Sequence, residues 1–165
     1  MIRLVNMFNV IQDLPPELIT ASVSALPVSE LRGAIPLGLG VFKLSPLSTF
    51  FFAVLGNIAI VFVLLLGLRF VSGFLGRRSL ICKRFFNWLF ERTTKLHQKK
   101  FQRFGDFALV TLVALPLPFT GAWTGSLAAF VFGIPFKKAF PLISLGVIMA
   151  GIIVTLATMG TIQIL

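Results

Sequence analysis

The chain has 165 residues, of which 57% are hydrophobic and only 12% are charged, and its formal net charge is +10. A soluble domain carries about twice that share of charged residues, so the composition indicates an integral membrane protein. Ten of the 15 basic residues lie between Arg69 and Arg103, in one polar connection. This clustering is typical of a cytoplasmic loop under the positive-inside rule, and it argues against nucleic acid as a partner.

Residues 1–14 mix apolar and polar types and predict either a short interfacial helix or a loosely ordered terminus. A helical stretch opens at Pro15-Pro16-Glu17, where proline and an acid both suit a first turn, and it stops at Pro27. A second short apolar stretch covers residues 34–42. Neither stretch is long enough to cross a bilayer. We therefore predict a re-entrant helical hairpin over residues 15–44, with a single kinked helix as the alternative.

The break of this hairpin carries two charged residues, Glu30 and Arg32. A charge at membrane depth costs on the order of 3 kcal/mol, so such residues usually face a cavity or a partner. A low-dielectric site favours the protonated form of a carboxyl, which suits Glu30 to carry a proton. The planar guanidinium of Arg32 fits a phosphate or carboxylate. The alternative is an internal salt bridge that only stabilises the hairpin.

Leu47–Leu68 follows as 22 residues without a charge, long enough to cross the hydrocarbon core as a helix. We predict a span over residues 46–69, which completes a first repeat at residues 15–70. Asn57 lies inside this span and is expected to form a hydrogen bond between helices.

Residues 71–104 form the basic connection, where apolar and aromatic side chains recur near helical spacing. This pattern favours an amphipathic helix at the headgroup level, with the cations of 77–103 facing anionic membrane lipid; a solvated loop is the alternative. Cys82 and His97 are the single cysteine and the single histidine of the chain. The sequence therefore predicts no internal disulfide, no metal site and no cofactor.

Residues 107–136 contain no charge, yet one straight helix of that length would be too long for the bilayer. Pro116, Pro118 and Gly121 near the middle of this stretch predict a second re-entrant hairpin over residues 105–136. A span over 138–161 then completes a second repeat at residues 105–162. Asp106, at the mouth of this hairpin, is expected to cap a helix, with pairing to Arg103 as the alternative.

The two interrupted apolar segments resemble each other at a spacing of about 89 positions. Such matching segments in two halves point to an inverted repeat with a transport site near the bilayer midplane. Each half crosses the membrane once, so the halves are inverted relative to each other. The matched pairs are Ala25-Leu26-Pro27 with Ala114-Leu115-Pro116, Gly33-Ala34 with Gly121-Ala122 after one gap, and Leu55-Gly56 with Leu145-Gly146.

Charge sets the predicted orientation. If residues 70–104 are cytoplasmic, Lys137-Lys138 are cytoplasmic too, because the second hairpin returns to its own side. With Arg69 at the end of the first span counted too, twelve cations then lie inside, against Arg3 and Lys43 outside, with Arg32 in the membrane. Both termini are expected to be extracytoplasmic.

The two breaks supply the candidate residues for binding a substrate or an ion. Broken helices expose backbone amides and carbonyls, and hydroxyl and indole groups add hydrogen-bond donors. For Gly121 and Gly125 the alternative is a helix-packing motif. The candidates are Glu30, Arg32 and Pro36 in the first half, and Pro116, Pro118, Thr120, Gly121, Trp123 and Thr124 in the second.

The segments Glu30–Leu37 and Pro116–Gly125 resemble the two signature segments of the putative small multidrug export proteins, which are prokaryotic integral membrane proteins of similar length. The resemblance implies residence in the plasma (inner) membrane. Phe119 departs from the family pattern, which has glycine there. The duplicated hairpin-plus-span arrangement is also similar to the DedA superfamily, which includes scramblases and polyprenyl-phosphate translocases. The acidic residue in the first hairpin of the DedA proteins corresponds to Glu30, but the arginine in their second hairpin has no counterpart in this chain.

These features predict an all-α membrane protein that transports a small solute or amphiphile, with Glu30 as a proton carrier. A DedA-like lipid translocase or scramblase is the alternative, with Arg32 and backbone amides binding a phosphate headgroup. A non-transporting membrane scaffold is a third class. The sequence contains no nucleotide loop and no catalytic Ser/His/Asp set, so we do not expect an enzyme. A homodimer is expected because four short or spanning units enclose only a small cavity.

Overall fold

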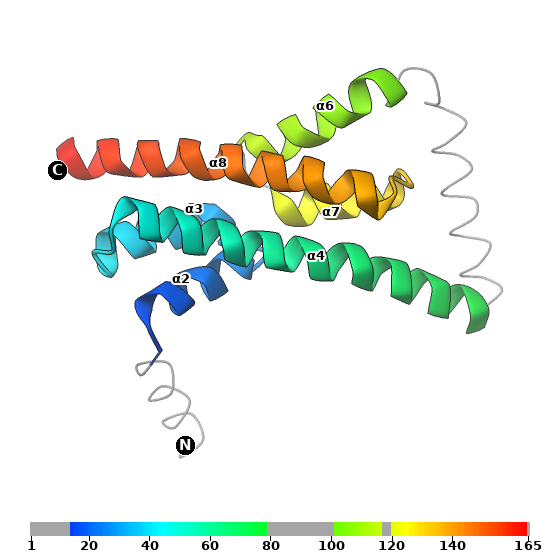
Figure 1. Ribbon diagram of the computed structural model, residues 1–165, viewed down its shortest axis with the longest axis horizontal. Helices are drawn as coiled ribbons and strands as arrows, with labels where there is room; N and C mark the ends of the chain where they lie inside the picture. The colour runs from blue at the N-terminus through cyan, green and yellow to red at the C-terminus, as the bar shows by residue number, and fades with distance from the viewer. Residues whose placement is uncertain (1–13, 79–100, 117–119, 165) are drawn as a thin grey trace, which may run out of the picture. The chain divides into compact units, whose positions relative to one another are not determined.

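A computed structural model describes residues 14–78, 101–116 and 120–164, and the regular elements in these ranges are all helices (Figure 1). The all-α class is therefore confirmed. Residues 1–13, most of the basic connection, Pro118 and Phe119 lie outside the described residues, and so do the predictions made for them. The elements are α2 (Pro16–Ala25), α3 (Glu30–Pro36), the π-helix η1 (Leu37–Val41), α4 (Pro46–Arg78), α6 (Phe101–Ala114), α7 (Ala122–Val131) and α8 (Phe136–Ile164).

The helices form two compact units. Unit 1 comprises Met1–Asn57 and Gly151–Leu165, and unit 2 comprises Ile58–Ala150. The long helices α4 and α8 each contribute one part to each unit.

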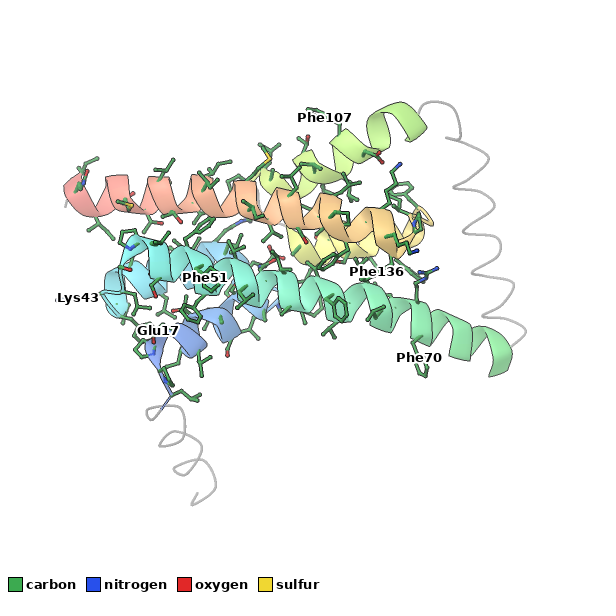
Figure 2. The ribbon with its side chains drawn as sticks, viewed as in Figure 1. Glu17, Lys43, Phe51, Phe70, Phe107 and Phe136 are labelled. Carbon is green, nitrogen blue, oxygen red and sulfur yellow. The ribbon has the colours of Figure 1, made fainter. Side chains whose placement is uncertain are left out.

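Unit 1 is built around the pair α2 and α3, with η1 continuing from α3 (Figure 1). Thr20 of α2 and Thr49 of α4 both lie against Gly38 of η1, and further along Ser24 of α2 contacts Ala53 of α4. Helices α2 and α4 therefore run in the same direction. The segment α2–α3–η1 returns to the end of unit 1 from which α4 starts. Figure 2 shows Glu17, in the first turn of α2, and Lys43, just after η1, at that same end.

The first hairpin differs from the prediction in where its second helix begins. We expected the break to extend to Gly33, but α3 already begins at Glu30. The amide of Gly33 donates to Ser29 O at 2.8 Å, so the first turn of the helix is complete before Ala34. Only Leu26–Ser29 remains as the break, and Glu30 and Arg32 are helical residues. Gly33 therefore does not act as a helix breaker here.

Pro36 explains why α3 becomes the π-helix η1. Proline has no amide hydrogen, so the carbonyl of Arg32 loses its usual helical partner. The next turn widens, and the amide of Phe42 donates to Leu37 O, five residues back, at 3.0 Å. Widened turns of this kind occur mostly as single-turn insertions and often lie at functional sites.

Unit 2 contains α6, α7 and the first part of α8 (Figure 1). A Cβ atom built on Gly125 of α7 would lie 2.4 Å from Val113 Cγ2, and one on Gly146 of α8 would lie 2.9 Å from Val110 O. Both helices therefore pack closely on α6. The packing alternative for Gly125 is supported by this contact.

Asp106 does not cap a helix, which corrects the prediction. It lies inside α6, which begins at Phe101, and its carboxylate pairs with Lys138 Nζ at 2.9 Å. The pair joins the first part of α6 to the start of α8. Since Val110 and Val113 contact Gly146 further along, α6 and α8 also run in the same direction.

Two described helices are long and apolar enough to cross a bilayer, over Pro46–Phe70 and Phe136–Ile164. They contain the predicted spans, 46–69 and 138–161, and α4 continues to Arg78. Both helices also expose large apolar side chains, including Leu47, Phe51 and Phe70 on α4 and Ile152 and Leu156 on α8. Exposed apolar surface of this extent suits lipid rather than water.

Candidate functional site: the hairpin tip and a buried polar seam

The tip of the first hairpin is a four-residue turn closed by hydrogen bonds. Val23 O accepts from the amide of Leu26 at 3.2 Å and from Ser29 Oγ at 2.6 Å. The amide of Glu30 donates to Leu26 O at 3.1 Å. Glu30 itself has φ of +43°, a left-handed conformation that is uncommon for a residue with a side chain. Such strained positions cost about 1–3 kcal/mol and concentrate at ligand sites and switches.

The candidate residues of the first half all lie on α3. Glu30 and Arg32 are half-buried, while Leu31 between them is fully buried and anchors the helix. Pro36 is exposed at the end of α3. The structure thus brings Glu30 and Arg32 into the first helical turn after the hairpin tip.

A polar seam, defined here as Thr20, Ser24, Thr49 and Asn57, lies between α2 and α4. All four side chains are at most 1% exposed. Ser24 Oγ donates to Ala53 O at 2.5 Å, and Asn57 Nδ2 donates to Ser24 O at 2.9 Å. The predicted interhelical hydrogen bond of Asn57 is therefore confirmed.

The backbones approach closely along this seam because Gly56 faces α2. A Cβ atom built on Gly56 would lie only 2.1 Å from Ala21 O, so no larger residue fits without a shift of the backbone. Small residues at such positions allow close contact between membrane helices. The close contact is what buries the polar seam.

Two atoms of the seam have no hydrogen-bond partner among the described residues, Thr49 Oγ1 and Asn57 Oδ1. A buried polar group without a partner costs about 1–3 kcal/mol. Sequence reasoning singled out Asn57 but missed Thr20, Ser24 and Thr49. Their spacing of four or eight residues along each helix was the available signal, since it places them on one face.

The second break contains the candidates of the second half. Thr120 Oγ1 donates to Leu115 O at 2.8 Å across the break, and Gly121, with φ of +137°, precedes α7. Trp123 is half-buried and Thr124 is exposed, both in the first turn of α7. Pro116 is exposed just after α6. The structure places these residues together at the break, and their binding role stays a prediction.

The two units use equivalent positions for equivalent contacts. Ala21 and Val110, 89 positions apart, each present a carbonyl oxygen to a glycine, Gly56 and Gly146, which are 90 positions apart. The chemistry at the seam nevertheless differs. At the same spacings, the polar seam of unit 1 corresponds in unit 2 to buried apolar residues, namely Leu109, Val113, Ala139 and Val147.

Two helices long and apolar enough to cross a bilayer, together with pairs of short apolar helices, are typical of a helical membrane protein. The chain matches the family described as "Putative small multi-drug export protein" over residues 30–153, and it belongs to that family. The match begins at the first residue of α3 and covers the second break, all of α4 and most of α8. The predicted family is thereby confirmed, and the description of that family points to a transporter role. No curated protein and no solved structure matches the chain.

Proposed function

We propose that the protein exports a small solute or amphiphile across the plasma membrane and that Glu30 carries the coupled proton. The observation that carries the proposal is the position of Glu30 at the tip of a hairpin beside the middle of an apolar helix. Asn57 lies within two residues of the midpoint of Pro46–Phe70, and its amide is bound to Ser24 O near the end of α2. Glu30 follows at the start of α3, directly after the turn Leu26–Ser29, and this position supports a placement of its carboxyl near mid-span.

A carboxyl at this depth can link protonation to transport. In a desolvated site its neutral, protonated form is favoured, whereas an aqueous cavity favours the charged form. Opening the hairpin tip to one side or the other therefore changes whether Glu30 holds a proton. A substrate bound beside it would move with the same change in access.

The parallel course of α2 with α4, and of α6 with α8, supports two re-entrant hairpins. Each hairpin would then enter and leave on the side from which its long helix starts. One continuous span per half gives inverted halves, with the basic connection cytoplasmic and both termini outside. The equivalent glycine contacts of Gly56 and Gly146 support descent of the halves from one repeated unit.

The test uses purified protein in liposomes with a pH-sensitive dye inside, an imposed pH gradient, and ethidium or benzalkonium as the probe. We expect probe addition to change the lumen pH, and Glu30→Gln to abolish that change. Glu17→Gln is the matched control, because Glu17 is also half-buried but lies at the outer end of α2. Proton movement that survives Glu30→Gln would reject the role of Glu30.

A second arm of the experiment separates solute export from lipid movement. Fluorescently labelled anionic lipid should cross the bilayer no faster with the protein than without it. Faster crossing that is slowed by Arg32→Ala would replace solute export with the translocase function. The absence of both activities would favour a scaffold.

A further inference from the structure

We propose that the polar seam of unit 1 binds a small monovalent cation between Ser24 and Asn57. This inference goes beyond the export of a solute and does not depend on proton transfer by Glu30. It rests on the burial, the unpaired atoms and the polarity of the seam.

The seam presents oxygen atoms inside an apolar helix pair. Asn57 is 1% exposed, and its Nδ2 group is held on Ser24 O at 2.9 Å, which fixes the side-chain amide against α2. Oδ1 of the same amide has no partner among the described residues. An amide oxygen only accepts hydrogen bonds or coordinates cations, so the group that satisfies it must be a donor or a cation.

The surroundings favour a positive ligand. Helix α2 ends at Ala25, one residue after Ser24, and the carboxyl end of a helix carries a partial negative charge. Ser24 Oγ donates its hydrogen to Ala53 O at 2.5 Å, so the lone pairs of Ser24 Oγ can still coordinate a ligand. Broken membrane helices bind cations in this way, through carbonyl oxygens and the carboxyl ends of half-helices near the midplane.

Packing alone does not require polar residues at these positions. The equivalents of Ser24 and Asn57 in unit 2 are Val113 and Val147, which are 2% and 1% exposed. The same close approach of a glycine to a carbonyl oxygen is present in both units. Two valines therefore fill the equivalent space, and the polar pair of unit 1 has a further role.

The shared chemistry of the ligand is a desolvated monovalent cation held by neutral oxygens. The cation is either an inorganic ion or the ammonium group of an organic solute. Thermal unfolding in lipid nanodiscs distinguishes them, with NaCl, KCl or methylammonium chloride replacing choline chloride at constant total chloride. A saturable rise of the unfolding temperature with Na⁺ or K⁺ identifies an inorganic ion, and a rise with methylammonium alone identifies an ammonium group.

The variants locate the site. Asn57→Val should raise the half-saturating concentration at least about tenfold, and Ser24→Val should raise it in the same direction. Asn57→Asp keeps the shape of the side chain and adds a negative charge, so it should lower the half-saturating concentration. This variant also tests the site if Asn57→Val does not fold. Ser144→Ala, at a buried hydroxyl of unit 2 that has no partner among the described residues, should respond as the unmodified protein. The proposal is overturned if Na⁺, K⁺ and methylammonium give the same unfolding temperature as choline. It is also overturned if the Asn57 variants have the same half-saturating concentration as the unmodified protein.

Discussion

Replacing Gly56 with alanine should separate α2 from α4 and unfold unit 1 more easily. The added Cβ would lie 2.1 Å from Ala21 O, 2.7 Å from its carbonyl carbon and 2.8 Å from its Cα, whereas ordinary contact begins near 3.4 Å. The obstructing atoms are backbone, so no side-chain rotation relieves the overlap. The helices must move apart by about 1 Å, and overpacking of this kind costs about 1–3 kcal/mol.

The same movement weakens the two interhelical hydrogen bonds, from Ser24 Oγ to Ala53 O and from Asn57 Nδ2 to Ser24 O. Interhelical hydrogen bonds in membrane proteins contribute about 0.6 kcal/mol each on average. The matched control is Gly67→Ala on the same helix, where no atom lies within 4 Å of the added Cβ. The gain in helix propensity is common to both variants, so Gly56→Ala should be about 2–4 kcal/mol less stable than the control.

The measurement is reversible unfolding in mixed micelles of increasing SDS content, followed by far-ultraviolet circular dichroism. The free energy of unfolding of both variants is extrapolated to the same micelle composition. Equal stability of Gly56→Ala and Gly67→Ala, within about 0.5 kcal/mol, would refute the close packing of α2 on α4.

Three further predictions concern unit 2 and the orientation of the chain. In the same titration, the free energy of unfolding of Gly146→Ala should be about 1–2 kcal/mol lower than that of Gly160→Ala. The reason is that the added Cβ at position 146 would lie 2.7 Å from Val113 Cβ and 2.9 Å from Val110 O. Equal stability of the two variants would contradict the packing of α8 on α6. Asp106→Asn should lower the free energy of unfolding by less than about 1 kcal/mol, because the side chains of Asp106 and Lys138 are 40% and 48% exposed. Since salt screens an exposed ion pair, 1 M NaCl should remove this loss of stability. A loss that is independent of salt would show that Asp106 acts other than through this pair. Cys82 should react with a membrane-impermeant maleimide in inside-out vesicles but not in intact cells. Lys43→Cys, in a variant without Cys82, should react in intact cells but not in inside-out vesicles. Labelling of Cys82 from outside would show that the orientation is the opposite of the predicted one.

The sequence predicts the helix ends where proline or a charge-free run decides them. Pro27 marks the end of the first short helix, and α2 does end at Ala25. The runs without charge locate both long helices, and each of the matching breaks lies between two short helices, α2 and α3 in the first half and α6 and α7 in the second. The start of α3 could not be read from the sequence, because it depends on the turn closed by Ser29 Oγ on Val23 O and on the unusual φ of Glu30.

The polar seam and the ion pair escaped prediction for a different reason. Threonine and serine occur throughout apolar helices, where their hydroxyls can bond back to the preceding turn, as Thr20 does with Pro16 O at 2.8 Å. Only the packing of α2 on α4 shows that Ser24 instead bonds across to Ala53 O. Asp106 and Lys138 are far apart in sequence, and their pairing follows from the course of α6 beside α8.

The length of α4 has an electrostatic consequence. The helix continues from Phe70 to Arg78, and eight further residues add about 12 Å to its length. At physiological salt the field of anionic headgroups is screened over about 8 Å. The backbone of α4 therefore extends beyond its apolar run by more than this screening distance, so the last turn of the helix experiences less of the headgroup field than the turn that follows Phe70.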